Sequence, residues 1–171
     1  MTKKNTWIII IFLLFLASLS LYLYKNSLPG ILRENGFKLE HVIYQEGYSL
    51  DSNNLTQIML LVKNDRVKIL GLTKKGLGWE ENVASSDSNK NASAGMTIVK
   101  GVGSNRYSEK HVFIAMYADD FNLNDVSKTD EFYLNINKFN VANRQLLFIH
   151  AIVGRDKKEF SSQEVLNYLD L

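Results

Sequence analysis

Cysteine is absent from the 171 residues of this chain. Its absence excludes disulfide bridges, thiolate metal sites and a cysteine nucleophile. It also excludes anchoring through an acylated cysteine. The folded part must therefore be stabilised by packing, and the roughly 145 residues after the N-terminal apolar run are enough for one ordinary domain.

Proline is almost as scarce, because Pro29 is the single proline of the chain. It lies just after the apolar run, so every strand candidate further along is free of the residue that most readily disrupts a strand.

The chain also lacks a strong charge of either sign. It has 20 basic and 18 acidic residues, but Lys3, Lys4 and Lys25 flank the apolar run and leave the rest of the chain close to neutral. A neutral domain has no electrostatic footprint for a polyanion. Nucleic acid is therefore not an expected partner.

The strongest positive feature is an uncharged run from Trp7 to Tyr24, reading WIIIIFLLFLASLSLYLY. A bilayer core of about 30 Å takes roughly 20 helical residues, so the run predicts a transmembrane helix over 7–24 and makes the lipid bilayer a partner. Two lysines precede the run, and the positive-inside rule then predicts a cytoplasmic tail over 1–6 and an extracytoplasmic remainder. Trp7 and Tyr24 suit the two interfaces.

A cleaved secretory signal is the alternative interpretation of this run. Ser18 and Ser20 form a small-x-small pair, but a cut after Ser20 would leave an apolar new terminus that begins at Leu21. The sequence therefore predicts a retained signal-anchor in a single-pass membrane protein, and the composition, rich in Asn, Lys and Ile, is typical of an exported bacterial protein.

Residues 25–36 form the expected membrane-proximal linker, with a short helix predicted over Ile31–Asn35 between Pro29 and Gly36. Beyond it the apolar period changes to two, which predicts a strand over Phe37–Tyr44. Leu55–Val62 and Val67–Leu72 then predict a hairpin.

Asn64 and Asp65, which tolerate positive φ, lie at the turn of that hairpin. The segment from Ala84 to Gly95 has no large apolar residue and predicts a mobile surface loop. Further strands are predicted over Met96–Val102, His111–Tyr117, Glu131–Asn137 and Gln145–Val153.

The tail from Ser161 or Ser162 to Leu171 has helical spacing, and Ser161 with Glu164 has the form of a capping box. The expected fold is therefore β-rich α+β. One mainly antiparallel sheet domain of about seven strands over 37–171 would carry a C-terminal helix.

Three histidines are present, His41, His111 and His150, and none has the spacing of a metal site. His150, within LLFIHAIV, is expected to be buried. A buried neutral imidazole can serve as a base or a ligand, but a hydrogen-bonded core histidine accounts for the same pattern.

The acidic segment Asp119–Glu131 comes closest to a ligand motif. Asp120, Asn122, Asn124 and Glu131 fall at positions one, three, five and twelve of a calcium loop. Asp125 stands where the motif needs glycine, and the flanking segments resemble strands where it needs helices. We therefore expect a solvated acidic loop, with no metal and no cofactor.

Lys63, Arg66, Lys68, Lys74 and Lys75 make a basic stretch across the first predicted hairpin. Such a stretch binds anionic headgroups if its side chains share a face near the bilayer. An ordinary wet strand face with lysines that discourage strand addition is the simpler interpretation. Trp79, beside Glu80 and Glu81, also has two alternative interpretations. It lines a carbohydrate groove, or it anchors a loop to the core.

Catalytic motifs are missing from the sequence. There is no Gly-x-Ser-x-Gly, and Gly101 and Gly103 lack the third glycine of a phosphate loop. The leading expectation is a non-enzymatic extracytoplasmic module that binds a protein, a cell-wall polymer or the membrane surface. The alternative is a cell-surface hydrolase or metal-assisted enzyme, which a cleft holding His111 or His150 against two carboxylates would favour.

The acidic loop generates the first prediction. Millimolar calcium should leave the melting temperature of the protein unchanged, because Asp125 replaces the glycine of the loop and a site that does not bind the ion adds no mass-action stabilisation. Thermal unfolding with and without calcium measures this. A saturable rise in melting temperature that Glu131→Gln abolishes would show that the loop is a calcium site.

Overall fold

The structure is a computed structural model of the whole chain, and it describes residues 3–51, 54–85, 87–88, 93–102, 107–118, 132–153 and 162–169. Its elements, in order, are α1 (Lys3–Lys25), α2 (Leu28–Glu34), the 3₁₀ turn η1 (Leu39–His41), β1 (Val42–Asp51), β2 (Asn54–Lys63), β3 (Arg66–Lys75), β4 (Gly78–Ala84), β5 (Ala94–Val102), β6 (Tyr107–Tyr117), β7 (Phe132–Val141), β8 (Arg144–Val153) and α3 (Ser162–Tyr168).

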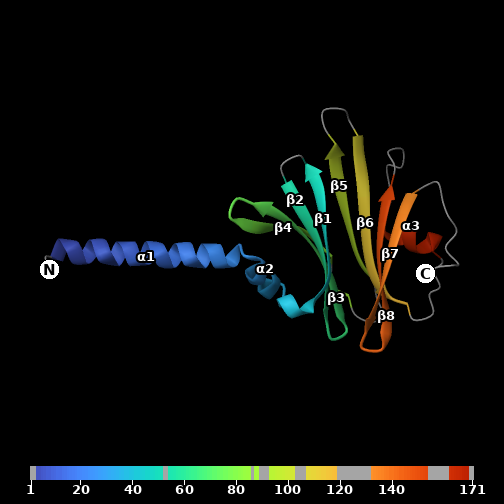
Figure 1. Cartoon of the computed structure of the whole chain (residues 1–171), viewed down its shortest axis with the longest axis horizontal. Helices are drawn as coiled ribbons and strands as arrows, with labels where there is room; N and C mark the ends of the chain where they lie inside the picture. The colour runs from blue at the N-terminus through green and yellow to red at the C-terminus, as the bar shows by residue number, and fades with distance from the viewer. Residues whose placement is uncertain are drawn as a thin grey trace.

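Helix α1 contains the whole predicted apolar run and projects from the rest of the molecule (Figure 1). Within it, Thr6–Lys25 has a mean hydropathy of 2.4, and none of its most apolar window is buried against the protein. By length and composition this helix is able to cross a membrane, and a signal sequence has the same properties.

Helix α2 follows α1 after a short turn and leads toward the sheets (Figure 1). Ser27 caps it, because its Oγ accepts a hydrogen bond from the backbone N–H of Gly30 at 3.2 Å. A Cβ on Gly30 would lie 2.1 Å from the carbonyl oxygen of Tyr24, so only glycine fits this close approach. The predicted short helix is confirmed, with a start three residues before Ile31, at Leu28.

The strands form two antiparallel four-stranded sheets, with orders β1-β2-β3-β4 and β5-β6-β8-β7. They face each other as a sandwich (Figure 1). The β-rich expectation with terminal helices is confirmed at this level, but the described residues form eight strands in two sheets and not about seven in one. The unexpected strand is β4, whose exposed Glu80, Glu81 and Asn82 carry no apolar alternation.

The strand predicted over Phe37–Tyr44 is wrong in its first half. Residues Leu39–His41 form η1, and β1 begins only at Val42. The Nδ1 atom of His41 accepts a hydrogen bond from the backbone N–H of Lys38 at 2.9 Å and closes this turn. Phe37 is buried, but against α2 and the outer face of the first sheet.

The hairpin of β2 and β3 is confirmed, with Lys63 opposite Arg66. Of its two turn residues, Asn64 has the expected positive φ of 57° and Asp65 does not. The turn between β7 and β8 has two such residues, Ala142 at 47° and Asn143 at 64°. This is the pattern of a type I′ turn, which matches the twist of the flanking strands.

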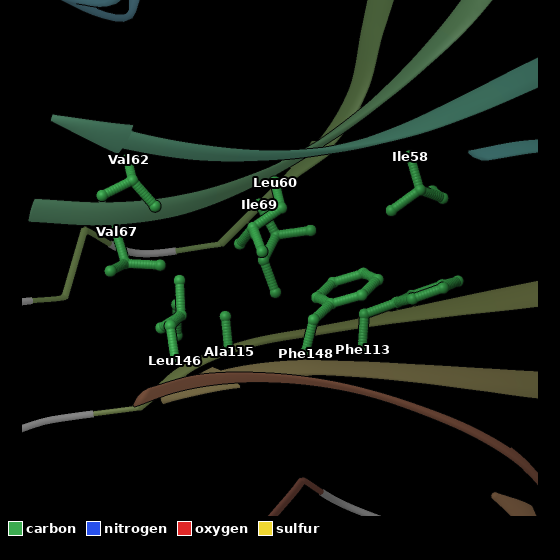
Figure 2. Close-up of a cluster of buried hydrophobic side chains, with 10 residues drawn as sticks. Ile58, Leu60, Val62, Val67, Ile69, Phe113, Ala115, Leu146 and Phe148 are labelled. Carbon is green, nitrogen blue, oxygen red and sulfur yellow. The ribbon is translucent and has the colours of Figure 1, made fainter. Parts of the chain in front are cut away.

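The central core lies between the two sheets, and Figure 2 shows side chains of both sheets pointing toward one another. Its buried members are Ile58, Leu60, Val62, Val67, Ile69, Ala94, Phe113, Ala115, Leu146 and Phe148.

Two further apolar layers cover the outer faces of the sheets. On the first sheet, Ile31 and Leu32 of α2 pack with Phe37 onto β2 and β3. On the second sheet, α3 packs Val165 and Leu166 onto β6 and β8, which confirms the expected C-terminal helix. The capping box cannot be placed, because Ser161 lies outside the described residues.

The expected surface loop over Ala84–Gly95 needs correction at both ends. Ser85 is buried, and its Oγ accepts a hydrogen bond from the backbone N–H of Ile69 at 2.9 Å. Ser88 is also buried and bridges to Val67. The last residues of the segment belong to β5, so its small polar residues serve partly to fit closely against β3.

The packing of α2 generates the second prediction. Leu32→Ala should lower the free energy of unfolding by about 2–5 kcal/mol, because the side chain is fully buried between α2 and the sheet. Denaturant unfolding of the full chain in micelles measures this. Leu39→Ala is the matched control, since Leu39 is 53% exposed and its truncation should cost little. Equal effects of the two changes would contradict this packing.

Candidate functional site

Polar side chains replace apolar ones at one end of the sandwich interior. Along β8, Leu146, Phe148 and His150 alternate on the inner face, and His111 occupies the corresponding face of β6. Both histidines are buried, with exposed fractions of 5% for His111 and 4% for His150. A buried imidazole needs hydrogen-bond partners, and the two rings supply them to each other.

The two imidazoles are in direct contact. Nδ1 of His111 lies 2.9 Å from Nε2 of His150, and the ring planes are nearly parallel at 21°. Phe113 stacks on His150 with ring centroids 4.4 Å apart. On the opposite side, the hydroxyl of Tyr48 lies 3.0 Å from Nδ1 of His150. Strand β1 of the first sheet is thereby joined to the second sheet by a polar contact.

Glu46 ends this chain of contacts. Its carboxylate accepts a hydrogen bond from the hydroxyl of Tyr44 at 2.6 Å and lies near the hydroxyl of Tyr48, whose pKa it helps to raise. The Tyr48 hydroxyl and Nδ1 of His150 share one hydrogen bond, and Nε2 of His150 and Nδ1 of His111 share a second, with donor and acceptor roles set by the imidazole tautomers. We call Tyr44, Glu46, Tyr48, His111 and His150 the inner polar chain.

The pKa values of Tyr44, Tyr48 and His150 move away from neutrality. Burial, with the neighbouring Glu46, raises the pKa of Tyr44 to about 12 and also raises that of Tyr48. Burial and the nearby His111 lower the pKa of His150 to about 4, against a smaller opposing effect of Glu46. At pH 7 His150 is therefore a neutral group that is hard to protonate, which is a poor general base.

The chain matches no protein-family model, no curated protein and no solved structure.

The structure brings together two of the three histidines singled out in the sequence. His41 lies apart in η1, with its ring at the edge of Phe37. A cleft with His111 or His150 against two carboxylates would favour the alternative enzymatic interpretation. Among the described residues, the inner polar chain supplies one carboxylate, Glu46, and no group of three metal-ligating residues is present in this part of the chain.

The candidate calcium residues Asp120, Asn122, Asn124 and Glu131 lie outside the described residues. Their role therefore stays a prediction.

Three members of the inner polar chain were missed in the sequence. Tyr44, Glu46 and Tyr48 recur at a period of two in β1, which places them on one face of the strand. The alternation was visible, but the identity of that face depended on how the two sheets pack.

The basic stretch is divided between the two ends of β3. At one end, Arg66 and Lys68 pair with Asp87 at 2.5 and 3.5 Å. At the other end, Lys75 pairs with Glu80 at 2.8 Å, close to the end of α1.

The contacts of Trp79 favour its interpretation as an anchor. Its ring packs against the α2 layer, and its backbone N–H donates a hydrogen bond to the carbonyl of Asn26 at 2.7 Å.

The inner polar chain generates the third prediction. The pKa of His150 is about 4 in the folded protein and about 6.5 when unfolded, so its contribution to stability is complete above 6.5 and is lost as the pH falls toward 4. Between pH 7 and 4.5 the wild-type protein should lose on the order of 2 kcal/mol more unfolding free energy than His150→Gln. Denaturant unfolding at both pH values measures this, and equal losses would contradict a buried neutral His150.

Proposed function

We propose that this chain is a single-pass membrane protein whose β-sandwich is held outside the membrane as a non-enzymatic binding module. The observation that carries the proposal is the exposure of α1. Trp7, Phe12 and Leu21 are 58–66% exposed, and an apolar helix bare along its length has no stable place in water. A bilayer supplies the missing surroundings.

The junction with the domain supports retention of the helix. Helix α1 continues without a break past Ser20 to Lys25. The end of α1 and the residue that follows it belong to the folded domain. The hydroxyl of Tyr24 accepts a hydrogen bond from Arg33 at 3.3 Å, and the carbonyl of Asn26 accepts one from the backbone N–H of Trp79. A cut after Ser20 would expose the apolar remainder of a helix that is continuous with the domain.

The orientation follows from the charges at the ends of α1. Lys3 and Lys4 stand at its start, and a single lysine, Lys25, stands at its end. The positive-inside rule then places residues 1–6 in the cytoplasm and the sandwich outside.

The edge strands of the sandwich are the surfaces at which a partner would bind. Helices α2 and α3 occupy the outer faces of the two sheets. Within the described residues, β7 pairs only with β8, over ten consecutive positions without a register shift, and Tyr133 on β7 is 64% exposed. A long regular edge strand is a template for an extended partner segment. The proposed partner is therefore a protein of the cell surface.

The topology generates the fourth prediction. The chain has no cysteine, so Asp65→Cys, at the exposed β2–β3 turn, introduces a unique thiol. A membrane-impermeant maleimide should label it on intact cells, and the purified protein should have the mass of the complete chain, 19.5 kDa. Lys3→Glu with Lys4→Glu should reduce this labelling, because the positive-inside bias is removed.

Labelling of Asp65→Cys only after lysis would contradict the orientation, and a shortened chain would contradict the anchor. For the binding role, a photoreactive residue at Tyr133 should give a discrete adduct with a surface protein on intact cells, whereas the same residue at Asp65 should not. The same pattern of products from both positions would contradict recognition along β7.

A further inference from the structure

The tip of the β3–β4 hairpin lies beside the last turns of α1. A cavity of about 510 Å³ separates them, lined on the helix side by Leu19, Tyr22 and Leu23 and on the hairpin side by residues 75–80. Figure 1 shows the hairpin reaching back to the end of the helix.

The hairpin is held firmly in this place. Besides the bond from Trp79 to Asn26, a Cβ added to Gly78 would lie 2.7 Å from the Cβ of Asn26, so backbone meets backbone without an intervening side chain. The tip therefore lies directly beside the end of α1.

Leu77 occupies this tip and is 93% exposed. It follows Gly76, which forms the turn with a positive φ of 57°. A Cβ added to Gly76 would have no atom within 4 Å. An apolar residue is not needed for the turn itself. A single exposed leucine is common on a surface in water. Leu77, however, lies at the same height along the axis of α1 as residues of the apolar run.

The depth of the tip follows from helix geometry. Leu19 precedes Lys25 by six residues, which corresponds to about 9 Å along the helix at 1.5 Å per residue. When α1 spans a bilayer with Lys25 at the outer surface, a hairpin beside Leu19 and Tyr22 extends below the headgroups to the start of the acyl chains.

The charges near the tip fit the same placement. Lys74 and Lys75 are exposed and precede Leu77 by three and two residues. Lysines at this level reach back to lipid phosphates, while their aliphatic stems stay beside apolar groups. The basic residues Lys74 and Lys75, the second of which also pairs with Glu80, therefore lie at this level beside α1.

We propose that the β3–β4 hairpin is a second membrane contact, in which Leu77 inserts into the outer leaflet and a phospholipid occupies the cavity between the hairpin and α1. This inference rests on the proposed function, because it requires α1 to be retained as a span. Two contacts, the helix and the hairpin, then set the orientation of the sandwich above the bilayer.

Spin labels on the full chain test this in liposomes of phosphatidylcholine and phosphatidylglycerol. The variants are Leu77→Cys, Leu16→Cys in the middle of α1 and Asp65→Cys at the opposite end of β3. The ratio of oxygen to nickel-chelate collisions rises with depth in the bilayer. We expect a high ratio at 16, an intermediate ratio at 77 and the aqueous value at 65.

The aqueous value at 77 together with a high ratio at 16 would overturn the hairpin contact alone. The aqueous value at 16 would overturn both the anchor and the hairpin contact. These two failures are therefore distinguishable.

The native tryptophans provide a second measurement without a label at the tip. The chain has two tryptophans, so Trp7→Phe leaves Trp79 as the only reporter. Brominated phosphatidylcholine should quench its fluorescence, and Leu77→Asn should reduce this quenching at least twofold, while Leu39→Asn should not. Equal quenching in all three backgrounds would overturn insertion through Leu77.

Discussion

The structure depends on strands that are apolar on both faces. In β2, Ile58 and Leu60 point into the sandwich, while Met59 and Leu61 point away from it, and all four are fully buried. Such a strand cannot leave one face in water without exposing large apolar side chains. The same holds for β8, so each sheet needs both the other sheet and an outer cover.

The outer cover of the first sheet is also its connection to α1. Helix α2 packs on that sheet and begins three residues after α1 ends. Arg66 strengthens this connection, because it donates a hydrogen bond to the carbonyl of Asn35 at 3.2 Å and its guanidinium lies 4.7 Å from the centre of the Phe37 ring. The apolar cover that stabilises the sandwich therefore also positions the sandwich relative to α1, and the β3–β4 hairpin completes the junction.

The inner polar chain has a different role from the apolar layers. Hydrogen bonds between β1 and β8 require one particular placement of the two sheets, whereas apolar contacts tolerate small shifts. At pH 7 His150 is neutral and both tyrosines are protonated. We interpret the inner polar chain as a device that aligns the sheets, which agrees with a domain whose proposed work is done at its edges and its membrane side.

The sequence by itself determined the apolar helix, the α2 linker, most of the strands and the C-terminal helix, because each is specified by a local pattern of apolarity, turn residues or caps. It also singled out His150 as buried. Only the tertiary structure decided that the strands divide into two sheets and that β4 joins the first. It also paired His150 with His111 and Tyr48, and placed Leu77 beside α1. These features join residues far apart in the chain, and an alternating pattern shows that two faces differ without showing which face meets which.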